Sequence, residues 1–321
     1  MRIATWNIRY DSDPKNIPLK DTIDKLPDCT VQFPFLTLHD EQNWADRRIR
    51  IAETLLNEGT DLVGLQEALK NQIDDLDQLL GDDWAWVGAG RDDGKEKGEY
   101  CPIFYKKSAL TLVSEAKHFW LSHTPYEPSA YPEAQHRICT IAQFTINNPP
   151  PGTPKAFSIL NTHLDWKIED QRTLGSSLLL QRAKYEAYKN NGGIPVFVIG
   201  DFNSQATGND SGGYRTITGS TPPVAINERF AKEFDTGDEG QGFKMLDLRG
   251  HTPRLAVSKN FATWTSFNSQ DTSEWMRLDF IFGGSNMKWK STAYKVPTTL
   301  QDDGLVTSDH RPVFADIFLQ Q

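Results

Sequence analysis

Apolar residues recur along this chain in two spacings, which predict interleaved strands and helices. Runs that alternate apolar with polar residues, or that are continuously apolar, are typical of strands. Apolar residues at three- and four-residue intervals are typical of amphipathic helices. The predicted strands are residues 2–8, 61–66, 84–87, 103–105, 110–113, 138–145, 156–163, 194–199, 278–282, 287–294 and 313–319, and the predicted helices are 45–56, 69–80, 174–188 and a short run at 225–234.

Strands occur in both halves of the chain with helices between them, and no repeat or linker divides it. This order favours one α/β domain over residues 1–321, in which two sheets pack on each other beneath outer helices. Residues 11–40 break the pattern, because prolines recur through them and interrupt any helix. Since this stretch exceeds an ordinary connection, we expect an inserted loop there, either a lid or a loose excursion.

The composition supports a globular fold and limits the function. Of 321 residues, 38% are hydrophobic and 24% are charged, which is enough to bury a sizeable core. The formal net charge of −9 disfavours long nucleic acid as a partner, because tight binding to it needs many Lys and Arg. No apolar run reaches the roughly 18 residues that cross a bilayer. Cys29, Cys101 and Cys139 lack the spacing of a zinc site or a disulfide scaffold, so we expect an intracellular, cytoplasmic protein.

Acidic, amide and histidine side chains stand at the ends of the predicted strands. A carboxylate directly beyond an apolar strand is costly to bury unless a metal, a cation or hydrogen bonds compensate it. The positions are Asn7, Glu67, His163, Asp165, Asp201, Asn203, Asp279, Asp309 and His310. If the strand ends converge, these side chains form one polar site.

The residue types of this set suit hydrolysis of a phosphoester. Carboxylate ligands from Glu67 and Asp309 favour a hard cation such as Mg²⁺ over zinc. Such a cation neutralises a phosphate oxygen during displacement at phosphorus. We expect Asp201 to orient and deprotonate the attacking water, and the two histidines of the set to donate hydrogen bonds to phosphoryl oxygens. Asp279 is then available to hold one of these imidazoles in place.

Six short motifs follow one another in order across nearly the whole chain. They are Thr5-Trp6-Asn7, Leu65-Gln66-Glu67, Asn161-Thr162-His163-Leu164-Asp165, Gly200-Asp201-Phe202-Asn203, Leu278-Asp279-Phe280-Ile281 and Ser308-Asp309-His310-Arg311-Pro312. In this order they resemble the endonuclease/exonuclease/phosphatase superfamily, which includes deoxyribonuclease-I-like nucleases, inositol polyphosphate 5-phosphatases and neutral sphingomyelinases. The resemblance implies a four-layered α/β/β/α sandwich that hydrolyses a phosphoester with a divalent metal, Mg²⁺ or Mn²⁺.

The resemblance also implies roles for the metal and the water. Asn7, Glu67 and Asp309 match metal-site residues of the superfamily, with the amide also near the phosphate. Asp201 matches the water-activating aspartate, and Asn203 matches the amide that steadies the transition state.

Three more positions match residues that contact the phosphate or act as a pair. His163 matches a phosphate-contacting position, and Asp279 with His310 matches an acidic residue and a histidine that work together. Apurinic-site nucleases of the superfamily carry Tyr in place of His163, which disfavours that branch.

Other residues look like those of a less characterised metal-dependent hydrolase branch of the superfamily. Arg47 or Arg48, Glu99 and Arg137 are candidate substrate-binding residues there, because a guanidinium can grip a phosphate or carboxylate with two hydrogen bonds. A solvated helix face or a salt bridge explains either member of the first arginine pair equally well.

Two residues just past the His163 motif complete the candidate substrate-binding set. They are Asp165 and Trp166. An indole can stack on a sugar or a base, although aromatic residues more often pack cores. Of the tryptophans that could stack in this way, Trp166 is the best candidate because of its place beside the motif.

These observations predict a Mg²⁺- or Mn²⁺-dependent phosphoesterase that attacks phosphorus with an activated water and forms no covalent intermediate. The acidic balance favours a small phosphorylated metabolite, sugar or lipid headgroup over long nucleic acid. A nuclease of short or single-stranded nucleic acid is the alternative, since a local basic groove is invisible in sequence. A non-catalytic binding module of the same fold is an alternative of another class, but it predicts a missing ligand or water activator. The sequence leaves open monoester against diester, one metal ion against two, protein partners and oligomeric state.

Overall fold

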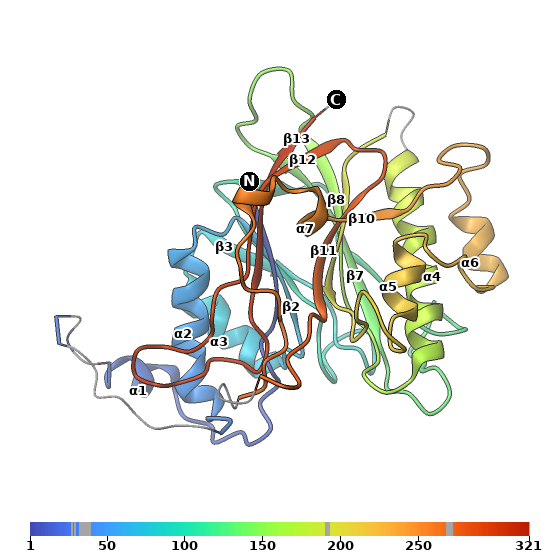
Figure 1. The fold of residues 1–321 in the computed structure, drawn as a ribbon. Coiled ribbons are helices and arrows are strands. Elements are labelled where there is room, and N and C mark those ends of the chain that lie inside the picture. Colours follow the sequence, from blue (N-terminus) through green and yellow to red (C-terminus); the bar gives the residue numbers. More distant parts are fainter. Residues whose placement is uncertain (27, 29, 32–39, 190–192, 268–271, 321) are drawn as a thin grey trace.

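Two β-sheets pack face to face in the computed structural model, which describes residues 1–26, 28, 30–31, 40–189, 193–267 and 272–320. Both chain ends lie at the same end of this sandwich (Figure 1). The first sheet has the strand order β12-β13-β1-β2-β4-β3. Its strands are β1 (Arg2–Asn7), β2 (Leu62–Gln66), β3 (Trp84–Val87), β4 (Ile103–Lys106), β12 (Trp289–Lys295) and β13 (Val313–Leu319).

The second sheet has the strand order β10-β11-β9-β8-β7-β5, and β6 also pairs with β7. Its strands are β5 (Leu110–Leu112), β6 (Lys117–Trp120), β7 (Ile138–Ile146), β8 (Ala156–His163), β9 (Val196–Asp201), β10 (Met245–Asp247) and β11 (Asp279–Gly284). Strands β1 and β2 run parallel, as do β8 and β9, whereas the other paired strands run antiparallel. Both sheets are therefore mixed.

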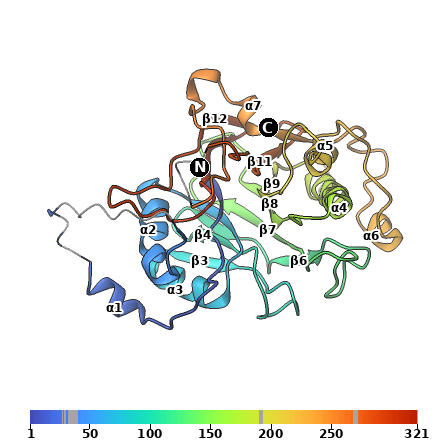
Figure 2. The same cartoon turned by 60° about the horizontal axis from the view of Figure 1, so that its bottom comes forward.

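Helices cover the outer face of each sheet, which gives the predicted four layers. Helices α2 (Trp44–Asn57) and α3 (Lys70–Leu80) lie on the first sheet, and α4 (Glu169–Tyr188) and α5 (Gly212–Ile217) lie on the second. Figure 2 shows α4 nearly end-on, with the strands between it and α2 and α3. The remaining helical segments are short: α1 (Leu19–Ile23), α6 (Glu228–Glu233), α7 (Leu248–His251) and a 3₁₀ turn at Arg254–Ala256.

Apolar side chains fill each space between layers. Ile3, Ile159 and Phe197 belong to the core between the two sheets, and each is fully buried. Separate apolar clusters lie between each sheet and its helices, and they include Leu178 of α4 and Leu55 of α2. Burial of a side chain of this size contributes about 1.5–3 kcal/mol, so the three cores together hold the layers in register.

One buried polar contact joins the two sheets below the strand ends. Gln66 of the first sheet donates from Nε2 to Asn161 Oδ1 of the second at 2.7 Å. Asn161 Nδ2 in turn donates to the carbonyls of Leu65 and Pro102, each at 2.9 Å. A Cβ at Gly64 would lie 2.6 Å from the Asn161 side chain, which explains the absence of a side chain there. These bonds fix how the two sheets sit against each other near the site.

The predicted strands and long helices are confirmed, whereas several short elements were not expected. Strand β6 begins with polar residues, and α5 begins with two glycines, so neither has a regular apolar spacing. The predicted insertion at 11–40 contains the short helix α1, and residues 27, 29 and 32–39 of it, including Cys29, lie outside the described residues. Cys101 and Cys139 are buried free thiols. Among the described residues, the helices are all too short or too polar to cross a membrane.

Candidate active site

Residues from distant parts of the chain meet where the strands of both sheets end. In the second sheet, His163 pairs in register with Asp201, which pairs on its other side with Asp279. Because paired residues on neighbouring strands point to the same face, the three side chains form one row. In the first sheet Asn7 ends β1, beside Gln66 at the end of β2.

The first and last sequence motifs are held together by direct hydrogen bonds. Trp6 Nε1 donates to the carbonyl of His310 at 2.9 Å, and Ser308 Oγ donates to the carbonyl of Asn7 at 2.7 Å. These bonds place Asp309, near the C-terminus, beside the end of the first strand.

The backbone is strained at three positions just beyond the strand ends. Arg9, Glu67 and Asn203 have φ angles of 59°, 61° and 45°, in the left-handed region that non-glycine residues rarely adopt. Such residues gather at functional sites, where the surrounding structure holds them. Gly200 meets a different demand, since a Cβ there would lie 2.0 Å from the Thr162 carbonyl oxygen of β8.

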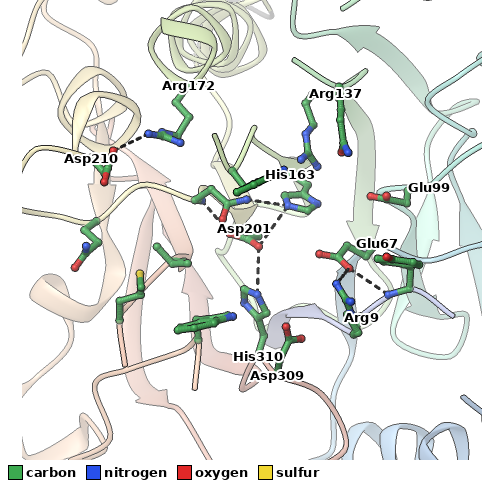
Figure 3. Close-up of a pocket in the computed structure, with 18 residues that line it drawn as sticks. Arg9, Glu67, Glu99, Arg137, His163, Arg172, Asp201, Asp210, Asp309 and His310 are labelled. Carbon is green, nitrogen blue, oxygen red and sulfur yellow. Dashed lines mark hydrogen bonds and ion pairs between the residues drawn. The ribbon is translucent and has the colours of Figure 1, made fainter. Parts of the chain in front are cut away.

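A pocket of about 540 Å³ opens over these strand ends (Figure 3). Nine predicted residues line it: Glu67, Glu99, Arg137, His163, Trp166, Asp201, Asn203, Asp309 and His310. Two more, Asn7 and Asp279, lie beneath the lining and hydrogen-bond to it. The convergence on which the sequence interpretation depends is therefore present.

Asn7 connects the carboxylates of the two sheets. Its Nδ2 donates to Glu67 Oε1 at 2.8 Å and to Asp201 Oδ2 at 3.0 Å. Its Oδ1 accepts a hydrogen bond from the Arg9 amide at 3.0 Å. One buried amide thus fixes the acid of the first sheet relative to the acid of the second.

Glu67 and Asp309 form an acidic pair beside Arg9. Burial and the nearby Glu67 carboxylate raise the pKa of Asp309. Arg9 Nη1 lies 3.8 Å from Glu67 Oε2. Burial lowers the pKa of Arg9, but Glu67, Asp309 and Glu41 outweigh this effect and raise it. The repulsion between Glu67 and Asp309 favours a positive charge between them, and their oxygens are the ligand type that hard divalent cations prefer.

Asp201 is buried and has no lysine or arginine partner among the described residues. It accepts hydrogen bonds from Asn7 and, at 2.9 Å, from the Asn203 amide. Burial and the adjacent Asp279 raise the pKa of Asp201 to about 7. A carboxylate with this pKa is a suitable proton acceptor near neutral pH.

His310 lies between two carboxylates. Its Nδ1 is 2.9 Å from Asp279 Oδ2, and its Nε2 is 3.7 Å from Asp201 Oδ2. Burial alone would lower the pKa of His310, but Asp279 and Asp201 outweigh it and raise this pKa well above the ordinary value. The ring is therefore an imidazolium whose Nδ1–H donates to Asp279 and whose Nε2–H faces Asp201.

His163 differs from His310 in its protonation. Burial and the charge of Arg137 lower its pKa well below the ordinary value, so the ring is neutral. Asn203 Nδ2 donates to His163 Nε2 at 3.0 Å and to the Leu164 carbonyl at 3.1 Å. The ring proton is then on Nδ1, which is buried and has no hydrogen-bond partner among the described residues. It is a donor available to a ligand.

Two groups of side chains could therefore hold a metal. Besides Glu67 and Asp309, ligand atoms of Asp201, Asp279 and His310 all lie within 4.8 Å of one another. The second group already has a proton in the bond between His310 and Asp279, which a metal would have to displace.

Three of the predicted substrate-binding residues do not reach the pocket. The buried Arg47 guanidinium donates to the carbonyls of Ile8 and Thr307 at 2.7 and 3.0 Å, so it ties the end of β1 to the loop before Asp309. Arg48 pairs with Asp75 at 2.8 Å, which is the salt-bridge alternative considered for it. Both face inward because α2 packs its arginine-bearing side against the first strand and the insertion.

Asp165 is the third such residue. Its Oδ1 accepts from the amides of Lys167 and Ile168, each at 2.9 Å, at the entrance to α4. These bonds help to lower the pKa of Asp165, although burial opposes them. Its carboxylate therefore holds the turn that leads into α4, a common use of Asp after a strand.

The pocket also contains lining residues that the sequence interpretation missed. They are Arg9, Tyr10, Gln135, Arg172, Gln205, Asp210, Trp264, Met276 and Leu278. Arg9 had a usable signal, because it stands two residues after Asn7. Most of the others come from loops, which carry no periodic pattern.

Residues 4–310 match the model of the Endonuclease/Exonuclease/phosphatase family. The chain belongs to this family. Proteins of the family are hydrolases that act on phosphoesters and generally use a divalent metal. Among curated proteins, none matches this chain significantly in sequence.

Solved structures of the family share the fold over almost the full chain. An endonuclease/exonuclease/phosphatase from Bacteroides vulgatus is 28% identical, with a TM-score of 0.73 over 99% of this chain and 98% of that one. A mannosyl-6-phosphatase from Bacteroides thetaiotaomicron is 23% identical, with a TM-score of 0.70 over 99% of this chain and 100% of the other. D. rerio TDP2 in complex with a single-strand DNA product is 17% identical, with a TM-score of 0.59 over 99% and 98%.

Proposed function

We propose that this protein hydrolyses the phosphoester of a small phosphorylated metabolite with the help of a divalent cation. The observation that carries the proposal is that His163 and Asp201, with Asp279 in the same row beneath the lining, share one pocket with Glu67 and Asp309. This arrangement offers a proton acceptor, hydrogen-bond donors and an acidic pair within a single site.

Glu67 and Asp309, with Asn7 beside them, are the residues proposed to hold the cation. Two carboxylates of one pocket that repel each other match the oxygen ligands of Mg²⁺ or Mn²⁺. When bound, such a cation would neutralise charge on a phosphoryl oxygen. We favour this pair over the group that contains His310, because the imidazolium there already carries the positive charge.

The other residues act on the water and the phosphate. Asp201 is proposed to accept the proton of the attacking water. The Nδ1–H of His163 and the Nε2–H of His310 are donors to phosphoryl oxygens, and Asp279 keeps the second ring protonated and oriented. Asn203 holds His163 in the tautomer that donates. None of the described lining residues is Ser, Thr or Cys, which supports direct attack by water.

A small phosphorylated substrate is supported by the size of the pocket and by the acidic balance of the chain. The neighbouring mannosyl-6-phosphatase acts on such a compound. The alternative is a nuclease of short or single-stranded nucleic acid, which the TDP2 complex with a DNA product favours. A binding module without activity has less support, because every residue that the chemistry needs is in place.

The test is phosphate release from sugar phosphates, inositol phosphates, nucleotides, phospholipids and oligonucleotides with Mg²⁺ or Mn²⁺. We expect release from small esters, its loss with EDTA and its recovery when the metal is restored. No release from any compound, or release that EDTA leaves unchanged, would contradict the proposal. Activity on oligonucleotides that falls steeply with added salt would instead favour the nuclease.

Metal binding is tested separately by calorimetry with the metal alone. Glu67→Gln should weaken Mg²⁺ binding by at least about tenfold, because it removes one anionic ligand. Glu115→Gln is the matched control, since Glu115 is exposed and lies away from this pocket. Equal affinity in the two variants would remove Glu67 from the metal site.

A further inference from the structure

The pocket has a polar region beside the catalytic row that the proposed chemistry leaves unused. It is formed by Glu99 and Arg137, and Trp166 lines the same pocket. Arg137 precedes β7, and Glu99 lies in the loop before β4. Figure 3 shows Arg137 and Glu99 on the same side of the pocket as Glu67, away from the Arg172–Asp210 pair. Each of the two shifts the pKa of the other, so the two side chains interact.

Arg137 presents buried hydrogen-bond donors without acceptors. Its side chain is 3% exposed, and neither Nε nor Nη1 has a hydrogen-bond partner among the described residues. The Oδ2 of Asp165 lies 3.6 Å from Nε, too far for a hydrogen bond, and it already accepts from the Gln135 backbone amide at 3.2 Å. A buried donor without an acceptor destabilises the free protein, so a ligand that places an acceptor here is favoured.

Glu99 presents an acceptor next to these donors. Arg91 Nη1 donates to Glu99 Oε2 at 2.7 Å, which fixes the carboxylate, and the second oxygen accepts no hydrogen bond from the described residues. Burial and the nearby Glu67 raise the pKa of Glu99.

The charges of this pair select a neutral ligand group. A second phosphate near Arg137 would be repelled by Glu99, and a cationic headgroup near Glu99 would be repelled by Arg137. A hydroxyl avoids both penalties, because it can accept from Arg137 and donate to Glu99. Two neighbouring hydroxyls satisfy both residues at once.

Trp166 adds a large apolar surface to the same pocket. Its side chain is 65% exposed, although it directly follows the buried Asp165. A flat aromatic face left exposed beside polar groups marks a binding surface for a ligand with both apolar and polar faces. A sugar ring has this character, with C–H groups on its faces and hydroxyls around its edge.

We propose that the part of the substrate that carries the phosphate is a sugar. Its neighbouring hydroxyls bind Arg137 and Glu99, and its ring packs against Trp166. This inference rests on the proposed function, because it identifies the substrate of the same site. It makes these three residues determinants of specificity rather than of the reaction at phosphorus.

The first test compares substrates and variants. Wild type, Glu99→Gln and Trp166→Ala are assayed on hexose 6-phosphate and on p-nitrophenyl phosphate. The ratio of kcat/KM for the hexose ester to that for the aryl ester should fall at least about tenfold in Glu99→Gln, mainly through KM. Glu96→Gln is the matched control, because Glu96 is exposed, lies three residues away and does not line the pocket.

The second test removes hydroxyls from the substrate one at a time. Deoxyhexose 6-phosphates should lose activity with wild type, and the hydroxyl that binds Glu99 should matter little to Glu99→Gln. Non-additive losses of this kind identify a direct contact. Fully additive losses for every hydroxyl would overturn the contact.

A third measurement separates failure of the inference from failure of the proposed function. Binding of hexose 6-phosphate and of ethyl phosphate is measured by calorimetry with Asp201→Asn, alone and combined with Glu99→Gln. If wild type hydrolyses aryl phosphate but neither binds nor prefers the hexose ester, only the sugar inference fails. If no phosphoester is hydrolysed, the proposed function fails, and weaker hexose phosphate binding in the double variant would still support the sugar contact. Preference for an oligonucleotide, lost in Trp166→Ala, would overturn the sugar in favour of a base.

Discussion

Two buried carboxylates beside the second sheet, Glu186 of helix α4 and Asp201 at the end of β9, differ in how the fold compensates their charge. Glu186 accepts hydrogen bonds from Arg182 and Lys189, and from Ser158 of β8 at 3.0 Å. Burial would raise the pKa of Glu186, but its two cationic partners outweigh burial and lower it. Asp201 has no lysine or arginine partner among the described residues, and burial and Asp279 outweigh the attraction of the His310 imidazolium and raise the pKa of Asp201 to about 7. The first charge is neutralised within the fold, whereas the second is left for a ligand or a reaction.

The same contrast holds for two buried arginines. Arg277 binds both oxygens of Asp247, at 2.6 and 2.7 Å, and donates to Tyr294 Oη at 2.9 Å. Burial lowers the pKa of Arg277, but Tyr294 and Asp247 outweigh it and raise it. Burial and repulsion from Arg91 lower the pKa of Arg137, which has two unpaired donors. Of these two arginines, Arg137, with two unpaired donors, lines the pocket, whereas Arg277, whose Nε alone is unpaired, does not.

The substitution Asp201→Asn should have the largest effect, and it tests whether Asp201 serves the reaction rather than the stability of the fold. We expect hydrolysis of p-nitrophenyl phosphate to fall by about 10²–10⁴-fold, because the proton acceptor is lost. The free energy of unfolding should stay the same or increase, because the variant removes a buried carboxylate for which burial and the repulsion from Asp279 outweigh the attraction of His310. Steady-state kinetics and denaturant unfolding without metal measure the two effects. If the variant kept its activity, or if it were much less stable than wild type, Asp201 would have a structural role rather than the proposed catalytic one.

Glu186→Gln should behave in the opposite way. Removing one partner of a buried ion pair costs about 3–5 kcal/mol, because Arg182 is left uncompensated. Activity per folded molecule should stay within about twofold, since Glu186 does not line the pocket. Denaturant unfolding checks the loss, with the exposed Glu239→Gln as the control. A loss below about 1 kcal/mol would mean that this network contributes little.

The same variant should also change how stability depends on pH. Because the pKa of Glu186 is lower in the folded protein than in the unfolded chain, its carboxylate stabilises the fold above the unfolded value of about 4.3. This stabilisation is lost as the pH falls through the lower folded value. The difference in unfolding free energy between wild type and Glu186→Gln should therefore shrink below about pH 4. A difference that persists there would rule out this linkage.

The smallest effect is expected for a half-exposed pair. Arg2 Nε donates to Asp316 Oδ1 at 2.8 Å, and both side chains are 31% exposed. Arg2 lowers the pKa of Asp316. Solvent screens such pairs, so Asp316→Asn should cost only about 0.2–1 kcal/mol and should lose even that in high salt. Unfolding at low and high ionic strength measures it, and a salt-independent cost would point to packing rather than charge.

The sequence predicted the parts of the site that follow from strands. Asp201 and Glu67 each come directly after a buried apolar run, so both the strand and its end were visible. The sequence could not separate Arg47 from Arg137, because both are arginines in promising motifs. Only packing distinguishes them: Arg47 is saturated by backbone carbonyls, and Arg137 is not. Residues such as Arg172 of α4 and Trp264 of a loop were missed, since their approach to the pocket depends on tertiary structure.

The bridging amide of Asn7 makes the spacing of two pocket acids a property of the whole sandwich. Glu67 belongs to one sheet and Asp201 to the other, so their separation depends on how far the sheets slide past each other. A core substitution that shifts one sheet relative to the other by a fraction of an ångström would change this separation. The rate of the proposed hydrolysis would then fall although no residue of the pocket is altered. Core residues such as Phe197 and Ile159, which lie between the sheets, therefore help to fix the distance between the two acids. Substitutions at these core positions should reduce activity even though they leave the pocket residues unchanged.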